Sequence, residues 1–185
     1  MDYGIYNVVD GIVTMFAFIK GGMVTSTQRY RTYELSRGDM KRLQEVFSAS
    51  IYVHIGISFA IVFLTETVGM WFFYEKMVIP AERMTAVMWV FQLSIVTMVV
   101  NVISVPYNSA IVAHEKMSAF AMISVAEAIL KLLIVYMLVI GNFDKLKLFA
   151  VLTVSLSLLI RIIYTQYSHW HFIETRRVFR PNLSL

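Results

Sequence analysis

Two charged residues inside an apolar stretch are the clearest chemical signal in this sequence. Glu127 and Lys131 lie four residues apart in the run Ala126-Glu-Ala-Ile-Leu-Lys-Leu-Leu133. On a helix this spacing puts both side chains on one face, with the acidic residue on the favourable N-terminal side. A charge at the centre of a bilayer costs about 2.5–3.5 kcal/mol on insertion scales, so the pair should face protein or water. It is either a charged patch on a translocation pathway or a structural ion pair that ties helices together.

Other polar residues also interrupt apolar stretches. Asp10 lies in the outer third of the first stretch and Glu66 near the outer end of the second, and either could be solvated by a cavity open to the outside. The position of Glu66 favours a marker of the water boundary over a residue of the pathway. His54 has no second histidine nearby, which favours a hydrogen-bonded packing role over a proton relay. The third stretch contains Asn101 and then Pro106, which breaks the helix near its end because proline lacks a backbone donor.

The elements that must position these residues are five long apolar stretches. The composition is 58% hydrophobic with a mean hydropathy of +0.69, above the apolar share of about 45–50% in soluble domains. About 20 helical residues cross the hydrocarbon core of a bilayer. We therefore predict an all-α polytopic transmembrane helix bundle over residues 1–167 and a cytoplasmic or interfacial tail over 168–185. The predicted spans are residues 3–25, 46–73, 85–112, 117–140 and 146–164.

Basic residues collect in alternate gaps between the stretches. The first gap, the third gap and the C-terminal tail, counted with Arg161 at the end of the last span, carry ten lysines and arginines, against four in the other two gaps. The positive-inside rule then places the C-terminus in the cytoplasm and the N-terminus outside. Because an external N-terminus must be translocated without a preceding helix, we expect a further helix before Tyr3. Membrane topology also explains the net charge of +4, so no nucleic-acid partner is predicted.

The sequence contains no signature of a soluble enzyme. It has no glycine-rich phosphate loop and no cysteine, and His169 and His171 are two residues apart, so their rings would point away from each other on a helix. No enzymatic activity, cofactor or metal site is predicted. In the first gap, Asp39 is expected to cap a helix that begins at Met40.

Four segments of the sequence are similar to segments of a known family: Tyr3–Val9, Ser26–Tyr30, Val105–Met117 and Glu127–Lys131. They resemble bacterial polysaccharide flippases of the O-antigen type, within the multidrug, oligosaccharidyl-lipid and polysaccharide exporter superfamily. The resemblance covers nearly the whole chain, although its motifs are diffuse.

This resemblance implies two six-helix bundles that face each other across a cavity and alternate between inward-open and outward-open states. The cargo would be an undecaprenyl-pyrophosphate-linked oligosaccharide, flipped across the bacterial inner membrane. The chain would correspond to helices two to six of the first bundle. The first helix of that bundle and the entire second bundle would have no counterpart in this sequence. Partners would be membrane lipid, the lipid-linked oligosaccharide, the missing parts or polysaccharide assembly proteins.

The resemblance also implies roles for individual residues. Lys131 would bind the anionic part of the cargo, and Glu127 would hold Lys131 or carry coupling protons or sodium. Asn101 would supply neutral hydrogen bonds and Pro106 a hinge, while Asp10 would lie on the substrate or ion pathway.

Two other functions are compatible with the same residues. One is a cation-coupled exporter of drugs or metabolites from the same superfamily. The other is a membrane fragment or partner subunit that transports nothing by itself, because alternating access needs two opposing halves.

Overall fold

The computed structural model describes residues 22–75, 81–140 and 145–176 of the chain, and in these residues every regular element is a helix. A helical segment at 22–37 is followed by α2 (Met40–Glu75), α3 (Ala81–Ala113), α4 (Met117–Ile140), α5 (Lys145–His171) and the short 3₁₀ helix η1 (Ile173–Thr175). Four of the helices, α2 to α5, are long and apolar enough to cross a membrane. The predicted polytopic helix bundle is confirmed. The first predicted span, residues 3–25, lies mostly outside the described residues, so the fifth crossing stays a prediction.

Three of the four long helices, α2, α3 and α5, extend beyond the apolar stretches from which they were predicted. The bounds of α4 match the predicted span at 117–140, but α2 begins at Met40 rather than 46 and α5 ends at His171 rather than 164. Hydropathy locates the edge of the hydrocarbon, whereas backbone hydrogen bonding carries a helix on into the polar layer. The predicted boundary between membrane domain and tail, at residue 168, therefore falls inside α5.

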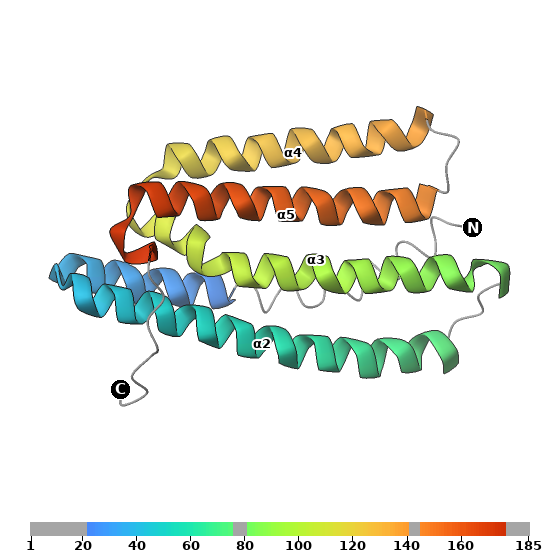
Figure 1. The fold of residues 1–185 in the computed structure, drawn as a ribbon, viewed down its shortest axis with the longest axis horizontal. Coiled ribbons are helices and arrows are strands. Elements are labelled where there is room, and N and C mark those ends of the chain that lie inside the picture. Colours follow the sequence, from blue (N-terminus) through green and yellow to red (C-terminus); the bar gives the residue numbers. More distant parts are fainter. Residues whose placement is uncertain (1–21, 76–80, 141–144, 177–185) are drawn as a thin grey trace.

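A tight turn joins the segment 22–37 to α2. The Asp39 side-chain Oδ1 accepts hydrogen bonds of 3.1 Å from the backbone N–H groups of Lys41 and Arg42, which confirms the expected N-cap. Gly38 precedes it with a φ of +73°, a left-handed conformation that glycine adopts without a steric penalty. The segment and α2 consequently form an antiparallel hairpin (Figure 1).

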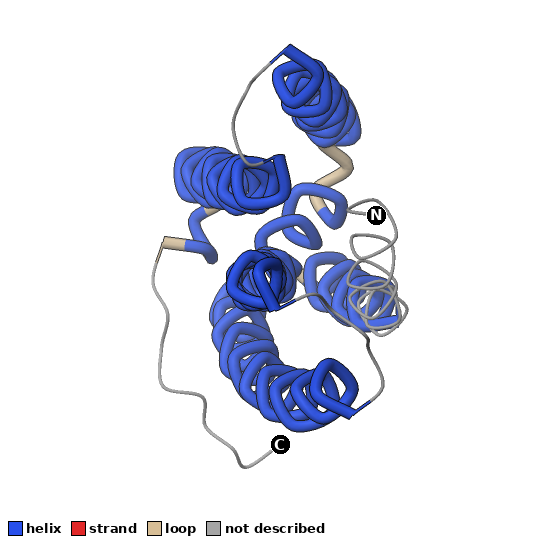
Figure 2. Tube along the Cα trace, turned by 90° about the vertical axis from the view of Figure 1, so that its right-hand side faces the viewer, coloured by secondary structure: helices blue, strands red, loops and turns tan. Residues whose placement is uncertain are grey.

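Helix α3 lies at the centre of the bundle. It makes its most extensive contacts with α5 and packs also against α2, while α4 lies against α5 at the outer edge. Figure 2, which looks along the helices, shows this placement of α4, the uppermost helix in both views. The main core cluster includes Phe47, Tyr107, Ile111, Ile160 and Tyr164.

Two helices approach closely where α2 carries a glycine. A methyl group added at Gly69 would lie 2.5 Å from the ring of Phe91, a side chain of α3 that is fully buried. Phe91 belongs to a second core cluster with Val87, Val90 and Ile95. Because Gly69 has no side chain, the backbone of α2 can approach the Phe91 ring of α3 closely at this point.

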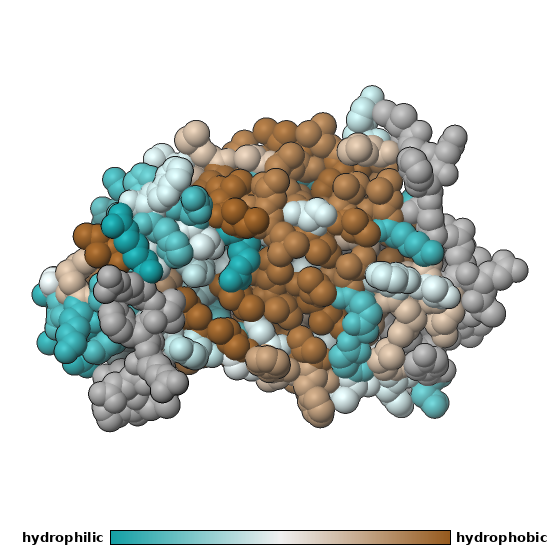
Figure 3. All heavy atoms as spheres, viewed as in Figure 1, coloured by the Kyte–Doolittle hydropathy of each residue, from teal (hydrophilic) through white to brown (hydrophobic). Residues whose placement is uncertain are grey.

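The hydropathy of the surface changes along the helix axes. The turn after the segment 22–37, the turn between α3 and α4, and the end of η1 lie at the same end of the bundle (Figure 1). Hydrophilic residues gather at this end, and a broad apolar surface covers the middle (Figure 3). Exposed tryptophans lie near both ends, with Trp170 at this one and Trp71 and Trp89 toward the other, as in the aromatic belts of membrane proteins. The chain is a multi-pass helical membrane protein.

Candidate functional site

The charged pair singled out from the sequence forms on α4. Lys131 Nζ lies 2.6 Å from Glu127 Oε1, and both side chains come from the same helix. The predicted shared face is confirmed. Because the pair spans one turn of a single helix, its ion pair does not itself join two helices of the described bundle.

The pair lies where the packed face of α4 meets its open face. Glu127 continues the row of Phe120, Ile123, Leu130 and Ile134, which pack into the main core cluster. The side chain of Glu127 is 31% exposed and that of Lys131 is 61% exposed. Of the α4 side chains that the structure describes, only Ile134 is buried. Lys131 thus projects from an apolar surface that the rest of the described chain leaves uncovered.

The other candidate residues are not gathered around this pair. Asn101 is half-buried on α3, and Pro106 is buried inside the C-terminal part of the same helix. Helix α3 changes direction near its C-terminal end (Figure 1). No hydrogen bond or ion pair links either of them to Glu127 or Lys131 in the described part of the chain. Asp10 lies outside the described residues.

A buried polar cluster, which sequence reasoning missed, surrounds Arg31. Arg31 is 1% exposed. Its Nη1 donates to the Pro106 carbonyl oxygen at 2.6 Å and to Ser109 Oγ at 3.3 Å, and its guanidinium carbon lies 4.8 Å from the centre of the Phe47 ring. A single arginine therefore links the segment 22–37 to α2 and to the bend of α3.

The acidic partner of this arginine comes from η1. Glu174 is also 1% exposed, and its Oε1 lies 3.9 Å from Arg31 Nη2. The same oxygen accepts a 2.6 Å hydrogen bond from His114 Nε2, in the turn after α3. The His114 ring stacks on Phe172 at a centroid distance of 4.1 Å. We call Arg31, Ser109, His114 and Glu174 the end cluster, because together they join four chain segments at the hydrophilic end of the bundle. We call this end the basic end, because it carries, in or next to its two turns, Arg37, Lys41, Arg42 and Lys116.

Burial and charge act in opposite directions within the end cluster. Burial lowers the pKa of the Arg31 guanidinium to about 10, and the Glu174 carboxylate opposes this effect. Burial by itself would raise the pKa of Glu174. The hydrogen bond from His114, a backbone hydrogen bond and the charges of His114 and Arg31 outweigh it, so the pKa of Glu174 is lowered. Glu174 therefore stays ionised at neutral pH and balances the buried guanidinium.

Sequence patterns contain little that could have revealed this cluster. Arg31 looks like one of several basic residues that set topology, and Glu174 lies in the segment taken for a tail. The nearest local signal is the spacing of Arg31 and Glu34, which puts both on one helix face. Both are buried, and Glu34 Oε1 lies 3.7 Å from Arg42 Nε. The pairing of Arg31 with Glu174 depends on η1 folding back against α2.

The fold and these sites define a class, the multi-pass membrane proteins built as helical bundles. Comparison with protein-family models, with curated proteins and with solved structures gives no match for this chain.

Proposed function

We propose that this chain is part of a transporter that flips lipid-linked oligosaccharide across the bacterial inner membrane by alternating access. The observation that carries the proposal is the Glu127–Lys131 pair on the open face of α4. The identity of the cargo in this proposal rests on the resemblance of the sequence to polysaccharide flippases.

The energetic cost of the Glu127–Lys131 pair depends on what surrounds it. A charged side chain that faces lipid near the centre of a membrane carries a cost of about 2.5–3.5 kcal/mol on insertion scales. Lys131 is mostly exposed in the described chain, so its face of α4 should border water or another protein surface rather than acyl chains. A second bundle opposite α4 would make this face one wall of a polar cavity.

Such a cavity suits the chemistry of the cargo. A glycan and a pyrophosphate need water and a cation, whereas the lipid tail can remain in the bilayer between the bundles. In this proposal the Lys131 ammonium contacts the pyrophosphate, and the Glu127 carboxylate at 2.6 Å holds the ammonium in place between transport events.

The bend of α3 supplies a place for the bundle to flex. Pro106 interrupts the hydrogen-bond ladder of α3, and the end cluster holds the polypeptide on the C-terminal side of the bend. We propose that the part of α3 before Pro106 moves relative to the end cluster during alternating access.

The basic end of the bundle is proposed to face the cytoplasm. Since the chain has no cysteine, single cysteines can report sidedness without further engineering. Arg37→Cys and Glu75→Cys are both exposed positions at opposite ends of the described hairpin and α2. A membrane-impermeant maleimide should label Glu75→Cys in intact spheroplasts and Arg37→Cys only after lysis. The reverse pattern would invert the proposed orientation.

Replacement of Lys131 tests the function itself. In a strain whose surface polysaccharide depends on this gene, Lys131→Ala should abolish export, and Lys131→Arg should retain part of it because the cation remains. Lys116→Ala is the matched control, as Lys116 is an exposed lysine in the turn before α4. Unchanged export by Lys131→Ala at normal protein level would contradict the proposal, as would an equal loss in Lys116→Ala.

A further inference from the structure

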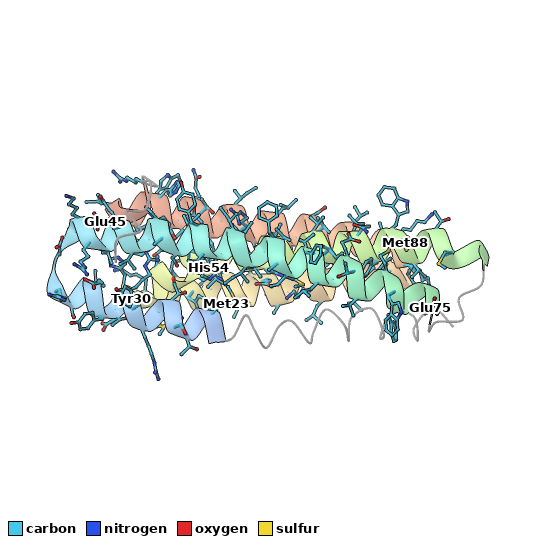
Figure 4. All side chains as sticks on the ribbon, turned by 90° about the horizontal axis from the view of Figure 1, so that it is seen from below. Met23, Tyr30, Glu45, His54, Glu75 and Met88 are labelled. Atoms are coloured by element: carbon cyan, nitrogen blue, oxygen red, sulfur yellow. The ribbon has the colours of Figure 1, made fainter. Side chains whose placement is uncertain are left out.

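An open cavity lies between the two helices of the N-terminal hairpin. Its volume is about 330 Å³, which exceeds the roughly 30 Å³ that one water molecule occupies in the liquid by about tenfold. Figure 4 shows Tyr30 on the segment 22–37 and His54 on α2, the two elements that enclose it. The lining residues are Ser26, Thr27, Tyr30, Val46, Ala49, Ser50, Val53 and His54.

His54 is the one imidazole in this cavity, and its ring is polarised by the backbone. It is 3% exposed, and its Nδ1 lies 2.7 Å from the carbonyl oxygen of Ser50. A carbonyl can only accept, so Nδ1 carries a proton and the neutral ring keeps a free lone pair on Nε2. Nε2 is buried and has no hydrogen-bond partner in the described chain. A packing histidine with both nitrogens satisfied would not have this arrangement.

We propose that His54 is a proton-binding site. Because Nε2 is buried in the described conformation, a movement of the hairpin must first bring cavity water to it; that water delivers the proton, and the resulting imidazolium keeps its Nδ1–H bond to Ser50. No bond other than N–H forms, and the proton comes from and returns to solvent. Ser26, Thr27 and Tyr30 are among the residues that line the same space, and each carries a hydroxyl group that can serve as a partner for water that solvates the charged ring.

Among the residues that line the cavity, His54 is the basic one, because none of the others is a lysine or an arginine. Tyr30 is the only other titratable residue among the lining residues, and Arg29 and Arg31 flank it on the same segment. On α2 the nearest carboxylates in sequence are Glu45 and Glu66, several helical turns away along the axis. Tyr52 on α2 and Tyr107 on α3 are further titratable residues, and Arg161 on α5 acts electrostatically on Tyr107. Helix α3 has no charged residue between Met84 and Ala113.

A proton at this position can influence the hairpin. Imidazolium formation places a charge between the segment 22–37 and α2, and hydration of that charge favours separation of the two helices. This part of the inference depends on the proposed transport function, because it makes the proton the ion that is coupled to flipping.

Nuclear magnetic resonance of ¹⁵N-histidine-labelled protein in nanodiscs tests proton binding directly. The chain has four histidines, and His54→Asn identifies the His54 signals by their loss. We expect neutral His54 with an unprotonated Nε2 at the alkaline end of a titration and imidazolium at the acidic end. Ala49→Leu, which fills the cavity and leaves His54 in place, should suppress this titration. A His54 ring that keeps one charge state throughout would overturn the proposal, as would full titration in Ala49→Leu.

Reconstituted vesicles then test coupling. A pH gradient should accelerate oligosaccharide flipping by the wild type, and His54→Gln should lose that acceleration while His171→Gln, an exposed histidine at the end of α5, keeps it. Gradient-driven flipping by His54→Gln at the wild-type rate would overturn the coupling role. If the wild type flips no oligosaccharide, the proposed function fails, and the proton site is still decided by the spectra.

Discussion

Arg31 and Pro106 are 75 residues apart in the chain, and a hydrogen bond of 2.6 Å joins the guanidinium of the first to the carbonyl oxygen of the second. Pro106 is where α3 loses a backbone donor. The arginine therefore binds the backbone at the point where the helix ladder is weakest. Because Nη2 of the same guanidinium lies 3.9 Å from Glu174 Oε1, Arg31 connects α3 at Pro106 to η1.

Arg31→Ala should destabilise the folded protein strongly. Removal of one member of a buried ion pair leaves the other charge uncompensated, which typically costs about 3–5 kcal/mol. Denaturant unfolding in detergent measures the loss. Arg29→Ala, at an exposed position in the same segment, should change the free energy of unfolding by about 0.5 kcal/mol or less.

A paired substitution separates the ion pair from simple packing. Glu174→Gln should cost less in an Arg31→Met background than in the wild type, because the guanidinium it compensates is gone. The free energies of unfolding of the wild type, the two single variants and the double variant give the coupling between the two side chains. Additive effects of the two changes would mean that Arg31 and Glu174 stabilise the fold independently rather than as a buried ion pair.

The lowered pKa of Glu174 predicts an acid-sensitive stability. The pKa is lowered from an ordinary value of 4.5, so the folded state releases this proton more readily than the unfolded state does. The contribution of Glu174 is complete above about pH 4.5 and is lost as the pH falls through the lowered pKa. Melting curves between about pH 6 and about pH 3 should show the wild type losing stability more steeply than Glu174→Gln. Parallel curves would show that Glu174 does not titrate with folding.

The transmembrane architecture could be predicted because its cause is local. Each span needs only a run of apolar residues long enough for the bilayer, and α4 was located to its end residues from that signal alone. The Glu127–Lys131 contact could likewise be predicted, since four residues along a helix fix the geometry. The Asp39 cap depends on three neighbouring residues and was predicted for the same reason.

The end cluster could not be predicted because its cause is tertiary. Arg31 and Glu174 meet only after α5 has continued past the apolar stretch and Phe172 has packed on His114. In the sequence, a basic residue that will be buried in an ion pair looks the same as one that only sets the orientation in the membrane. Similarly, the free Nε2 of His54 follows from the hydrogen bond of Nδ1 and from the cavity beside it, neither of which a lone histidine in an apolar run reveals.

Two glycines of α2 should respond in opposite directions to alanine. At Gly69 the new methyl group would meet the buried Phe91 ring at 2.5 Å, and overpacking of this kind costs about 1–3 kcal/mol. At Gly56 nothing lies within 4 Å, so the better helix propensity of alanine should stabilise by up to about 1 kcal/mol. Thermal unfolding of the two variants in the same detergent compares them. Equal shifts would mean that α2 and α3 are not in close contact at Gly69.

Exchange of the two charges on α4 separates insertion from transport. The double variant Glu127→Lys, Lys131→Glu keeps an ion pair at the same spacing, and the less favourable order of charges costs only about 0.2–0.5 kcal/mol. Protein level and melting temperature should therefore stay near those of the wild type. The cation, however, moves by one helical turn, about 6 Å along the axis, onto the row of Phe120, Ile123 and Leu130 that packs into the core.

If the cavity binds the anionic cargo through the ammonium of Lys131, moving the cation by one helical turn should abolish that binding. Surface polysaccharide should be lost in the exchanged variant, as in Lys131→Ala, even though the pair is intact. Wild-type export by the exchanged variant would show that α4 needs a neutralised pair only for its own insertion. In that case the open face of α4 would be a docking surface for protein, and the anion of the cargo would have to be bound elsewhere.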